Sequence, residues 1–162
     1  MKLFSKVINH SLMIYLSLFS LSLVSCVQSK TIREDKVIST INGFFNALDV
    51  DNYNCDKLSE WVTEDFMLYE MKKPFTRDQF CDFVDEGLSG MTSTDWVLSD
   101  FTISTDYNSA HVYYRNKARF VTISKDGKEL VMNMEWLESA YIIRQKDGKL
   151  KIKFLSSDDI NN

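Results

Sequence analysis

The stretch that decides the fold runs from Asp126 to Ile152 and reads DGKELVMNMEWLESAYIIRQKDGKLKI. Its two Asp-Gly pairs, at residues 126–127 and 147–148, enclose a segment of alternating character, and Asp-Gly in that setting favours a β-hairpin. Asn108-Ser109 is a further turn signal upstream. These turns predict four consecutive antiparallel strands, which we expect over residues 93–106, 109–125, 128–146 and 149–156.

The predicted strands are long and bent. The middle two exceed the usual strand length of about five or six residues. In the first strand, Trp96 and Leu98 lie on one phase of the alternation, whereas Phe101 and Ile103 lie on the other. That change of phase predicts a β-bulge at residues 99–100. We therefore expect a sheet that curls around another layer of the protein.

The chain before these strands has helical periodicity. Thr31 and Glu34 have the spacing of a capping box at the start of a helix. An apolar stripe follows at helical spacing, formed by Val37, Ile41, Phe44, Phe45 and Leu48. The polar cluster over residues 49–54 ends this helix, and a short second helix is expected to carry Leu58, Trp61 and Val62.

A brief strand is predicted over residues 66–71, and Pro74 then interrupts the chain. Thr76 and Gln79 again have capping-box spacing, so a third helix should begin there and end near Gly90. Helices followed by a run of antiparallel strands indicate an α+β domain, with three N-terminal helices packed on one face of a curved antiparallel sheet.

The first 25 residues have the pattern of an export signal. Lys2 and Lys6 give it a basic start, and the apolar run over residues 12–24 is short for a membrane-spanning helix. Residues 23–26 read Leu-Val-Ser-Cys, which resembles the lipobox of bacterial lipoproteins, in which the cysteine is acylated and becomes the first mature residue. We therefore expect a lipoprotein signal peptide over residues 1–25, a lipidated tether over 26–31 and one domain over 32–160.

The predicted lipidation of Cys26 also bears on location. Several acyl chains hold a protein on a bilayer far more stably than one, so Cys26 would anchor the domain to a membrane without any basic patch. In the lipoprotein pattern, Val27 in place of Asp favours the outer membrane. The expected location is the bacterial cell envelope, with the membrane as a partner through Cys26.

Charge argues against a nucleic-acid partner. Removing residues 1–25 from the 162-residue chain leaves 137, and only two of the 19 Lys and Arg are removed with them. The remaining 17 basic residues face 23 acidic ones, a net charge of −6. Nucleic-acid binders usually present a basic face, so we predict no such partner.

Two cysteines, Cys55 and Cys81, remain in a compartment where disulfides persist. They could pair with each other. The alternative, which we favour from the sequence because cysteine is among the most buried residue types, is that both are small, unpaired core residues.

Four segments together resemble the nuclear transport factor 2-like (SnoaL-like) superfamily. These are Phe44-Phe45-Asn46-Ala47-Leu48, Val62-Thr63-Glu64-Asp65-Phe66, Trp136-Leu137-Glu138-Ser139-Ala140 and Lys146-Asp147-Gly148-Lys149-Leu150-Lys151-Ile152. The resemblance implies a cone-shaped domain with a pocket at its open end. It does not imply one activity, because the superfamily includes ketosteroid isomerases, polyketide cyclases, dehydratases and many members without chemistry.

Glu138 is the one candidate catalytic residue. Strand alternation places it on one face with Trp136, Ala140 and Ile142, and such apolar surroundings disfavour an ionised carboxylate. The alternative is a structural carboxylate that is hydrogen-bonded or paired with a cation such as Arg119. A wider set of residues, Trp61, Tyr69, Trp96, Tyr114, Trp136 and Glu138, is predicted to line a ligand pocket, although such aromatic residues are more often simply core.

Several kinds of chemistry lack their motifs. His111 is the only histidine after residue 25, and the cysteines are scattered, so we predict no metal site, no catalytic triad and no cofactor. No glycine-rich phosphate loop is present. Relatives that the chain resembles often have Trp at the position of Leu150 and His at that of Ser156, and both are missing here, which weakens the case for an enzyme.

The favoured function is therefore non-catalytic binding of a small apolar ligand or a protein partner by a lipid-anchored domain. The alternative is an acid–base enzyme of the isomerase or cyclase kind, in which Glu138 carries the proton and Tyr69 or Tyr141 polarises a carbonyl. In either case a homodimer could form through the outer face of the sheet, which carries Tyr113, Arg115 and Val121.

Overall fold

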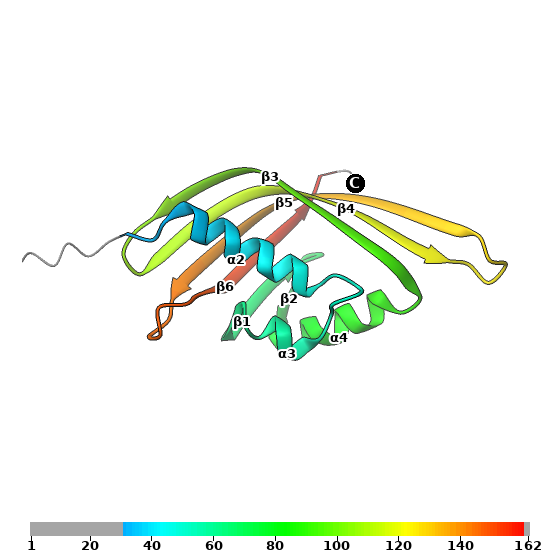
Figure 1. The fold of residues 1–162 in the computed structure, drawn as a ribbon, viewed down its shortest axis with the longest axis horizontal. Coiled ribbons are helices and arrows are strands. Elements are labelled where there is room, and N and C mark those ends of the chain that lie inside the picture. The colour runs from blue at the N-terminus through cyan, green and yellow to red at the C-terminus, as the bar shows by residue number, and fades with distance from the viewer. Residues whose placement is uncertain (1–30, 161–162) are drawn as a thin grey trace, which may run out of the picture. The chain divides into compact units, whose positions relative to one another are not determined.

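A computed structural model describes residues 31–160 (Figure 1). The predicted signal peptide and Cys26 lie outside the described residues. The elements, in chain order, are α2 (Glu34–Ala47), α3 (Cys55–Leu58), β1 (Val62–Glu70), β2 (Lys73–Thr76), α4 (Arg77–Leu88), β3 (Met91–Thr105), β4 (Ser109–Ile123), β5 (Glu129–Arg144) and β6 (Leu150–Asp159). Thr31–Asn162 form a compact unit of their own, and the whole hydrophobic core lies within it.

The six strands form one sheet in the order β2-β1-β6-β5-β4-β3. The predicted meander of four antiparallel strands is present as β3 to β6. The sheet as a whole is not purely antiparallel, because β1 pairs with β6 in parallel and with β2 in antiparallel orientation. Pairing of β1 with the last strand joins residues too far apart for local sequence signals to reveal.

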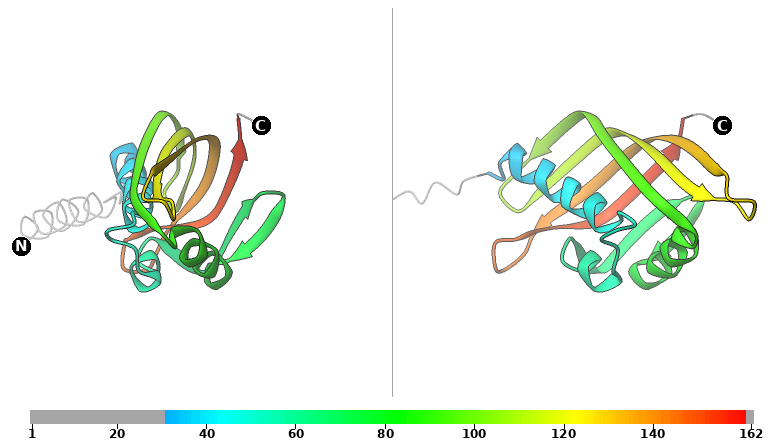
Figure 2. Two further views of the ribbon diagram at one scale, coloured as in Figure 1. Left: turned by 90° about the vertical axis from the view of Figure 1, so that its right-hand side faces the viewer. Right: turned by 45° about the vertical axis from the view of Figure 1, so that its right-hand side comes forward.

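The helices lie against the inner side of the curved sheet (Figure 2). Helix α2 contacts β3 and β6, whereas α4 contacts β1 and β2. The expected group of three N-terminal helices is not found, because only α2 is a multi-turn helix ahead of the sheet and α4 follows the β1–β2 hairpin. The predicted second helix ends at Leu58, and Val62 already belongs to β1.

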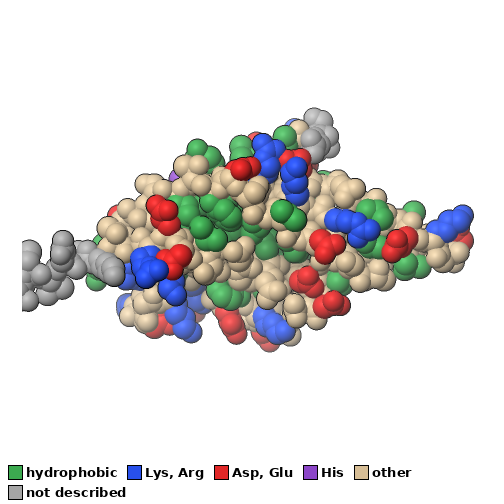
Figure 3. Space-filling view, turned by 45° about the horizontal axis from the view of Figure 1, so that its top comes forward, with side chains coloured by type: hydrophobic (Ala, Val, Ile, Leu, Met, Phe, Trp, Pro, Cys, Tyr) green, Lys and Arg blue, Asp and Glu red, His purple; other side chains and the backbone are tan. Residues whose placement is uncertain are grey.

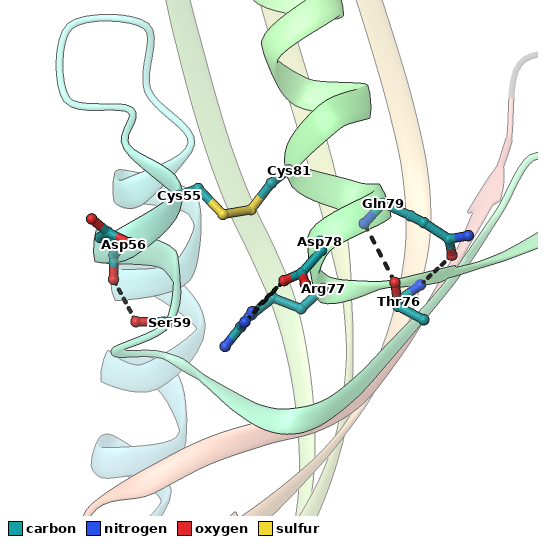
Figure 4. Close-up of polar contacts among 8 residues, drawn as sticks. All are labelled: Cys55, Asp56, Ser59, Thr76, Arg77, Asp78, Gln79 and Cys81. Atoms are coloured by element: carbon teal, nitrogen blue, oxygen red, sulfur yellow. Dashed lines mark hydrogen bonds and ion pairs between the residues drawn. A yellow bond between two sulfur atoms is a disulfide. The ribbon is translucent and has the colours of Figure 1, made fainter.

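The two predicted capping boxes have different outcomes. Helix α4 has its capping box, in which the Gln79 backbone N–H donates to the Thr76 hydroxyl and the Thr76 N–H donates to the Gln79 side chain (Figure 4). The box predicted for Thr31 and Glu34 is wrong. The N-cap of α2 is Arg33, whose side chain makes no capping bond and instead pairs with Asp35.

Cys55 and Cys81 form a disulfide that joins α3 to α4, with 5.6 Å between their Cα atoms (Figure 4). The preference for unpaired core cysteines is therefore wrong. Cys81 is buried, as that interpretation expected, and Cys55 is partly buried, but the fold also brings them into bonding geometry. Two short helical segments with few other mutual contacts are thereby held together.

The predicted bulge in β3 is confirmed. Asp100 has a positive φ of 56°, and the pairing with β4 shifts between Ser99 and Thr102. The extra residue compensates the phase change in the sequence. Residues on both sides of the bulge, Trp96, Leu98, Phe101 and Ile103, therefore all pack against the core.

The β1–β2 hairpin was not predicted. Its turn residues Met71 and Lys72 both have positive φ, and Pro74 lies in β2. Proline discourages a strand assignment, but β2 is an edge strand, where a missing N–H donor is tolerated.

No helix within residues 31–160 is both long enough and apolar enough to cross a lipid bilayer.

Candidate functional site

A cavity of about 380 Å³ lies between the helices and the concave face of the sheet. Its walls are mainly apolar and aromatic, with Phe44 and Phe80 contributed by the helices and Trp96, Met134 and Trp136 by the strands. At its rim lie three side chains that are substantially exposed, Met71, Phe83 and Met132. The cavity is therefore suited to an apolar guest and is open to solvent at one end.

Glu138 is a buried carboxyl residue at the wall of this cavity, with 3% of its surface exposed. Strand pairing places Tyr114 of β4 directly opposite it. The Tyr114 hydroxyl donates to Glu138 Oε2 at 2.5 Å, and the Asn116 amide donates to Glu138 Oε1 at 2.9 Å. Both carboxylate oxygens thus have a donor, and the carboxyl group has a fixed orientation.

Burial raises the pKa of Glu138 to about 7, against the opposing effect of its hydrogen bonds from Tyr114 and Asn116. Tyr114 is fully buried, and burial together with the nearby Glu138 charge raises its pKa well above the usual 10. Tyr114 therefore keeps its proton and acts as a donor. Glu138 can exist in both protonation states near neutral pH.

A second carboxyl, Glu70 at the end of β1, also lines the cavity. Its pKa is raised by burial, and the negative charges of Asp159 and Asp158 act in the same direction. The Ser157 hydroxyl lies within hydrogen-bonding reach of both Glu70 and Glu138, and its one proton can be donated to either. A row of polar side chains thus crosses four neighbouring strands, from Glu70 through Ser157 and Glu138 to Asn116.

Three buried polar atoms of cavity-lining residues have no hydrogen-bond partner within the described structure. They are Asn116 Oδ1 and the Nε1 atoms of Trp96 and Trp136. Unsatisfied buried polar atoms are costly, typically about 1–3 kcal/mol each, and native proteins retain few of them. Their concentration around one cavity indicates that polar atoms of a ligand or of water complete them.

The structure brings four of the six predicted pocket residues together. Trp96, Trp136 and Glu138 line the cavity, and Tyr114 lies directly behind Glu138. Trp61 does not reach it, because its ring packs against Gly43 of α2 instead. Tyr69 is 45% exposed and packs against Phe154 with the two rings tilted, since alternation along β1 turns Leu68 and Glu70 inward and Tyr69 outward.

Two proposed partners of Glu138 are also elsewhere. Arg119 pairs with Asp95, with 3.7 Å between the charged atoms, so it does not neutralise Glu138. Tyr141 is 39% exposed and, like Tyr69, it does not line the cavity. Neither tyrosine named for polarising a carbonyl can do so beside Glu138, whereas Tyr114 touches it.

Sequence reasoning missed Glu70, Asn116 and Ser157. Asn116 had a detectable signal, because it is the one polar residue on the inward phase of β4 between Tyr114 and Ala118. Ser157 could not be found by alternation, since a pairing irregularity between β5 and β6 changes the phase of the last strand. Consequently Ser157 rather than Ser156 lines the cavity.

Among the described residues, no group of three or more His, Cys, Asp or Glu side chains has the arrangement of a metal site. His111 lies on the exposed side of β4, where its ring bonds to Ser139.

Comparison with known proteins gives the fold but no activity. No protein-family model and no curated protein matches the sequence. Solved structures do match. A protein of the nuclear transport factor 2-like family from Streptomyces avermitilis aligns with a TM-score of 0.67 and 11% identity, over 80% of this chain and 97% of that one. The fold is nuclear transport factor 2-like.

Two further solved structures agree. The Kfla4162 protein from Kribbella flavida aligns with a TM-score of 0.67 and 11% identity, over 78% of this chain and 90% of that one. A ketosteroid isomerase-like protein from Erwinia carotovora atroseptica aligns with a TM-score of 0.59 and 11% identity, over 79% of this chain and 96% of that one. At these identities the nuclear transport factor 2-like fold is shared, while the residues that define an activity must be argued from this chain alone.

Proposed function

We propose that this protein is a lipid-anchored domain of the bacterial cell envelope that binds a small, mainly apolar molecule and performs no chemistry on it. The cavity between the helices and the sheet carries this proposal. It combines apolar walls, an open rim and a few fixed polar groups, which is the usual composition of a ligand pocket.

The binding experiment uses a chain that starts at Thr31, since the core lies wholly within that unit. Titration with 1-decanol should raise the melting temperature and change the fluorescence of Trp96 and Trp136. The variant Gly87→Phe should weaken binding strongly, because a Cβ atom built at Gly87 meets nothing within 4 Å and the ring beyond it would occupy the rim of the cavity. Glu86→Phe, on the neighbouring exposed position of α4, is the matched control.

Absence of any decanol effect on the unaltered chain would contradict the proposal, and so would equal weakening by both variants. The anchor is tested separately in cells that express the full chain. Cys26→Ser should move the protein from the membrane fraction to the soluble fraction. The variant keeps Cys55 and Cys81, so the disulfide between them is retained. A variant that stays with the membrane would argue against lipidation at Cys26.

A second candidate function, an acid–base enzyme, is favoured by one observation. Glu138 has a pKa of about 7 and contacts the Tyr114 hydroxyl beside the cavity, so a proton carrier and a donor are adjacent. Exchange of the α-protons of cyclohexanone in D2O, followed by proton NMR, is a direct probe. Catalysed exchange that disappears in Glu138→Gln would favour this candidate over simple binding.

A further inference from the structure

The charged residues that line the cavity have one sign. Glu70, Glu138 and Asp159 lie on its wall, and no described residue that lines it is Lys, Arg or His. The outer face drawn in Figure 3 differs, because it carries acidic and basic side chains intermixed. A cavity that admits apolar guests thus presents them with carboxyl groups only.

Glu70 and Glu138 are held by neutral groups. Glu138 accepts hydrogen bonds from Tyr114 and Asn116, and the single Ser157 hydroxyl lies within hydrogen-bonding reach of both Glu138 and Glu70. The charges that act on them are other carboxylates: Glu70 acts on Glu138, and Asp158 and Asp159 act on Glu70. A cation placed between them would relieve both the burial and the mutual repulsion.

The neighbouring groups also suit a cation. Asn116, which is 1% exposed, lines the cavity and has an Oδ1 acceptor without a partner. The rings of Trp96 and Trp136 lie 6.3 Å apart on the same wall, and indole faces attract ammonium groups. A primary ammonium has three N–H donors and no acceptor, which matches two carboxylates and one amide oxygen.

We infer that the ligand is a cationic amphiphile, an apolar body bearing an amine, with its ammonium group held between Glu138, Glu70 and Asn116. This inference rests on the proposed binding function and specifies the ligand class. Fatty acids and other anionic amphiphiles of the same size are disfavoured, because every charged side chain on the cavity wall is acidic. The competing possibility is that the indole N–H groups of Trp96 and Trp136 bind an anion.

Three probes with the same ten-carbon chain separate these possibilities: decylamine, 1-decanol and decanoate. Isothermal titration of the chain starting at Thr31 should give the tightest binding for decylamine, about tenfold or more tighter than 1-decanol, and the weakest for decanoate. In Glu138→Gln and Glu70→Gln the preference for decylamine over decanol should shrink by about tenfold, while decanol binding persists. Glu64→Gln, an exposed position on the same strand as Glu70, should leave the preference unchanged.

The outcomes are distinct for the two proposals. If 1-decanol binds and decanoate binds as tightly as decylamine, the inference about the amine fails while the binding function stands. If the preference for decylamine survives in both Gln variants, the assigned carboxyls are wrong. If none of the three probes binds, the proposed function fails and the inference fails with it.

Discussion

Glu138 shows how one residue couples the interior of this protein to pH. Its ordinary pKa is 4.5, and in the folded protein burial raises the pKa to about 7. Between these values the unfolded chain has released a proton that the folded protein retains. Stability from this group is therefore complete below pH 4.5, falls as the pH rises toward 7, and levels off above it.

The variant Glu138→Gln should remove this dependence. Relative to the variant, the unaltered protein should lose about 2.5 kcal/mol of unfolding free energy between pH 5 and pH 8, because burial raises the pKa of Glu138 from 4.5 to about 7. Urea unfolding at pH 5 and pH 8 measures the difference. Exposed, paired carboxyls such as Asp65 with Lys153 are present in both proteins, so their contributions to the pH dependence of the unfolding free energy cancel in the comparison. Parallel pH profiles for the two proteins would show that Glu138 is not the buried carboxyl responsible.

Alternation along a strand predicted Glu138, Trp96 and Trp136 because each lies on a long, regular segment with a clear inward phase. It could not exclude Tyr69 or find Ser157, because the phase at these positions depends on pairing with a distant strand. Tyr69 lies on a strand whose inward residues are Leu68 and Glu70, and Ser156 follows an irregularity in pairing with β5. A single sequence carries no signal for either.

At the scale of elements, two helices each contain a glycine, and the space beside the two glycines differs. A Cβ built at Gly43 of α2 would lie 2.4 Å from the Trp61 ring, whereas one at Gly87 of α4 meets nothing within 4 Å. Gly43→Ala should therefore destabilise the fold by about 1–3 kcal/mol through overpacking. Gly87→Ala should stabilise it by about 0.5–1 kcal/mol through helix propensity.

Chemical denaturation of the two variants at one pH checks these two predictions. The deciding result is the sign of the change in unfolding free energy for each variant. Both replacements add the same methyl group to a helix, so propensity alone would stabilise both. Stabilisation by Gly43→Ala would mean that Trp61 can leave its position against α2 without cost.

The disulfide is the second prediction at this scale. It closes a loop between positions 26 residues apart, and the loop-entropy relation gives about 3.5 kcal/mol for that length. Replacing Cys55 and Cys81 together by Ala should lower the unfolding free energy by about this amount. Reduction of the unaltered chain should approach the same value, measured by urea unfolding with and without dithiothreitol. Alkylation of the oxidised chain from Thr31 should modify no thiol.

The order of helices and strands was predictable where each has a local signal, as in the Thr76–Gln79 capping box and the Asp-Gly turns. The α2 capping box was mispredicted because Thr31 and Glu34 have the right spacing while Arg33 occupies the N-cap. The disulfide and the parallel β1–β6 pair join segments remote in sequence. Long-range pairing, rather than local propensity, separates the predicted fold from the observed one.

At the scale of the whole molecule, the outer face of the sheet exposes several large apolar side chains. Tyr113, Leu137 and Tyr141 are between 39% and 50% exposed and lie on the adjacent strands β4 and β5, on the side turned away from the core. Apolar side chains gathered on one sheet face commonly mark a contact surface. The predicted homodimer would use this face, leaving the cavity on the opposite side of the sheet unobstructed.

Sedimentation of the chain from Thr31 at increasing concentration should show a monomer–dimer equilibrium. Leu137→Lys should shift it to the monomer, because it removes an exposed apolar side chain and places a second cation beside Arg115, its partner on β4. Tyr107→Ser, which changes a similarly exposed residue in the loop between β3 and β4, should leave the equilibrium unchanged. Since Leu137 and Glu138 point to opposite sides of β5, Leu137→Lys should also bind decanol normally. Loss of both dimer and ligand binding would show that the two faces of the sheet depend on each other.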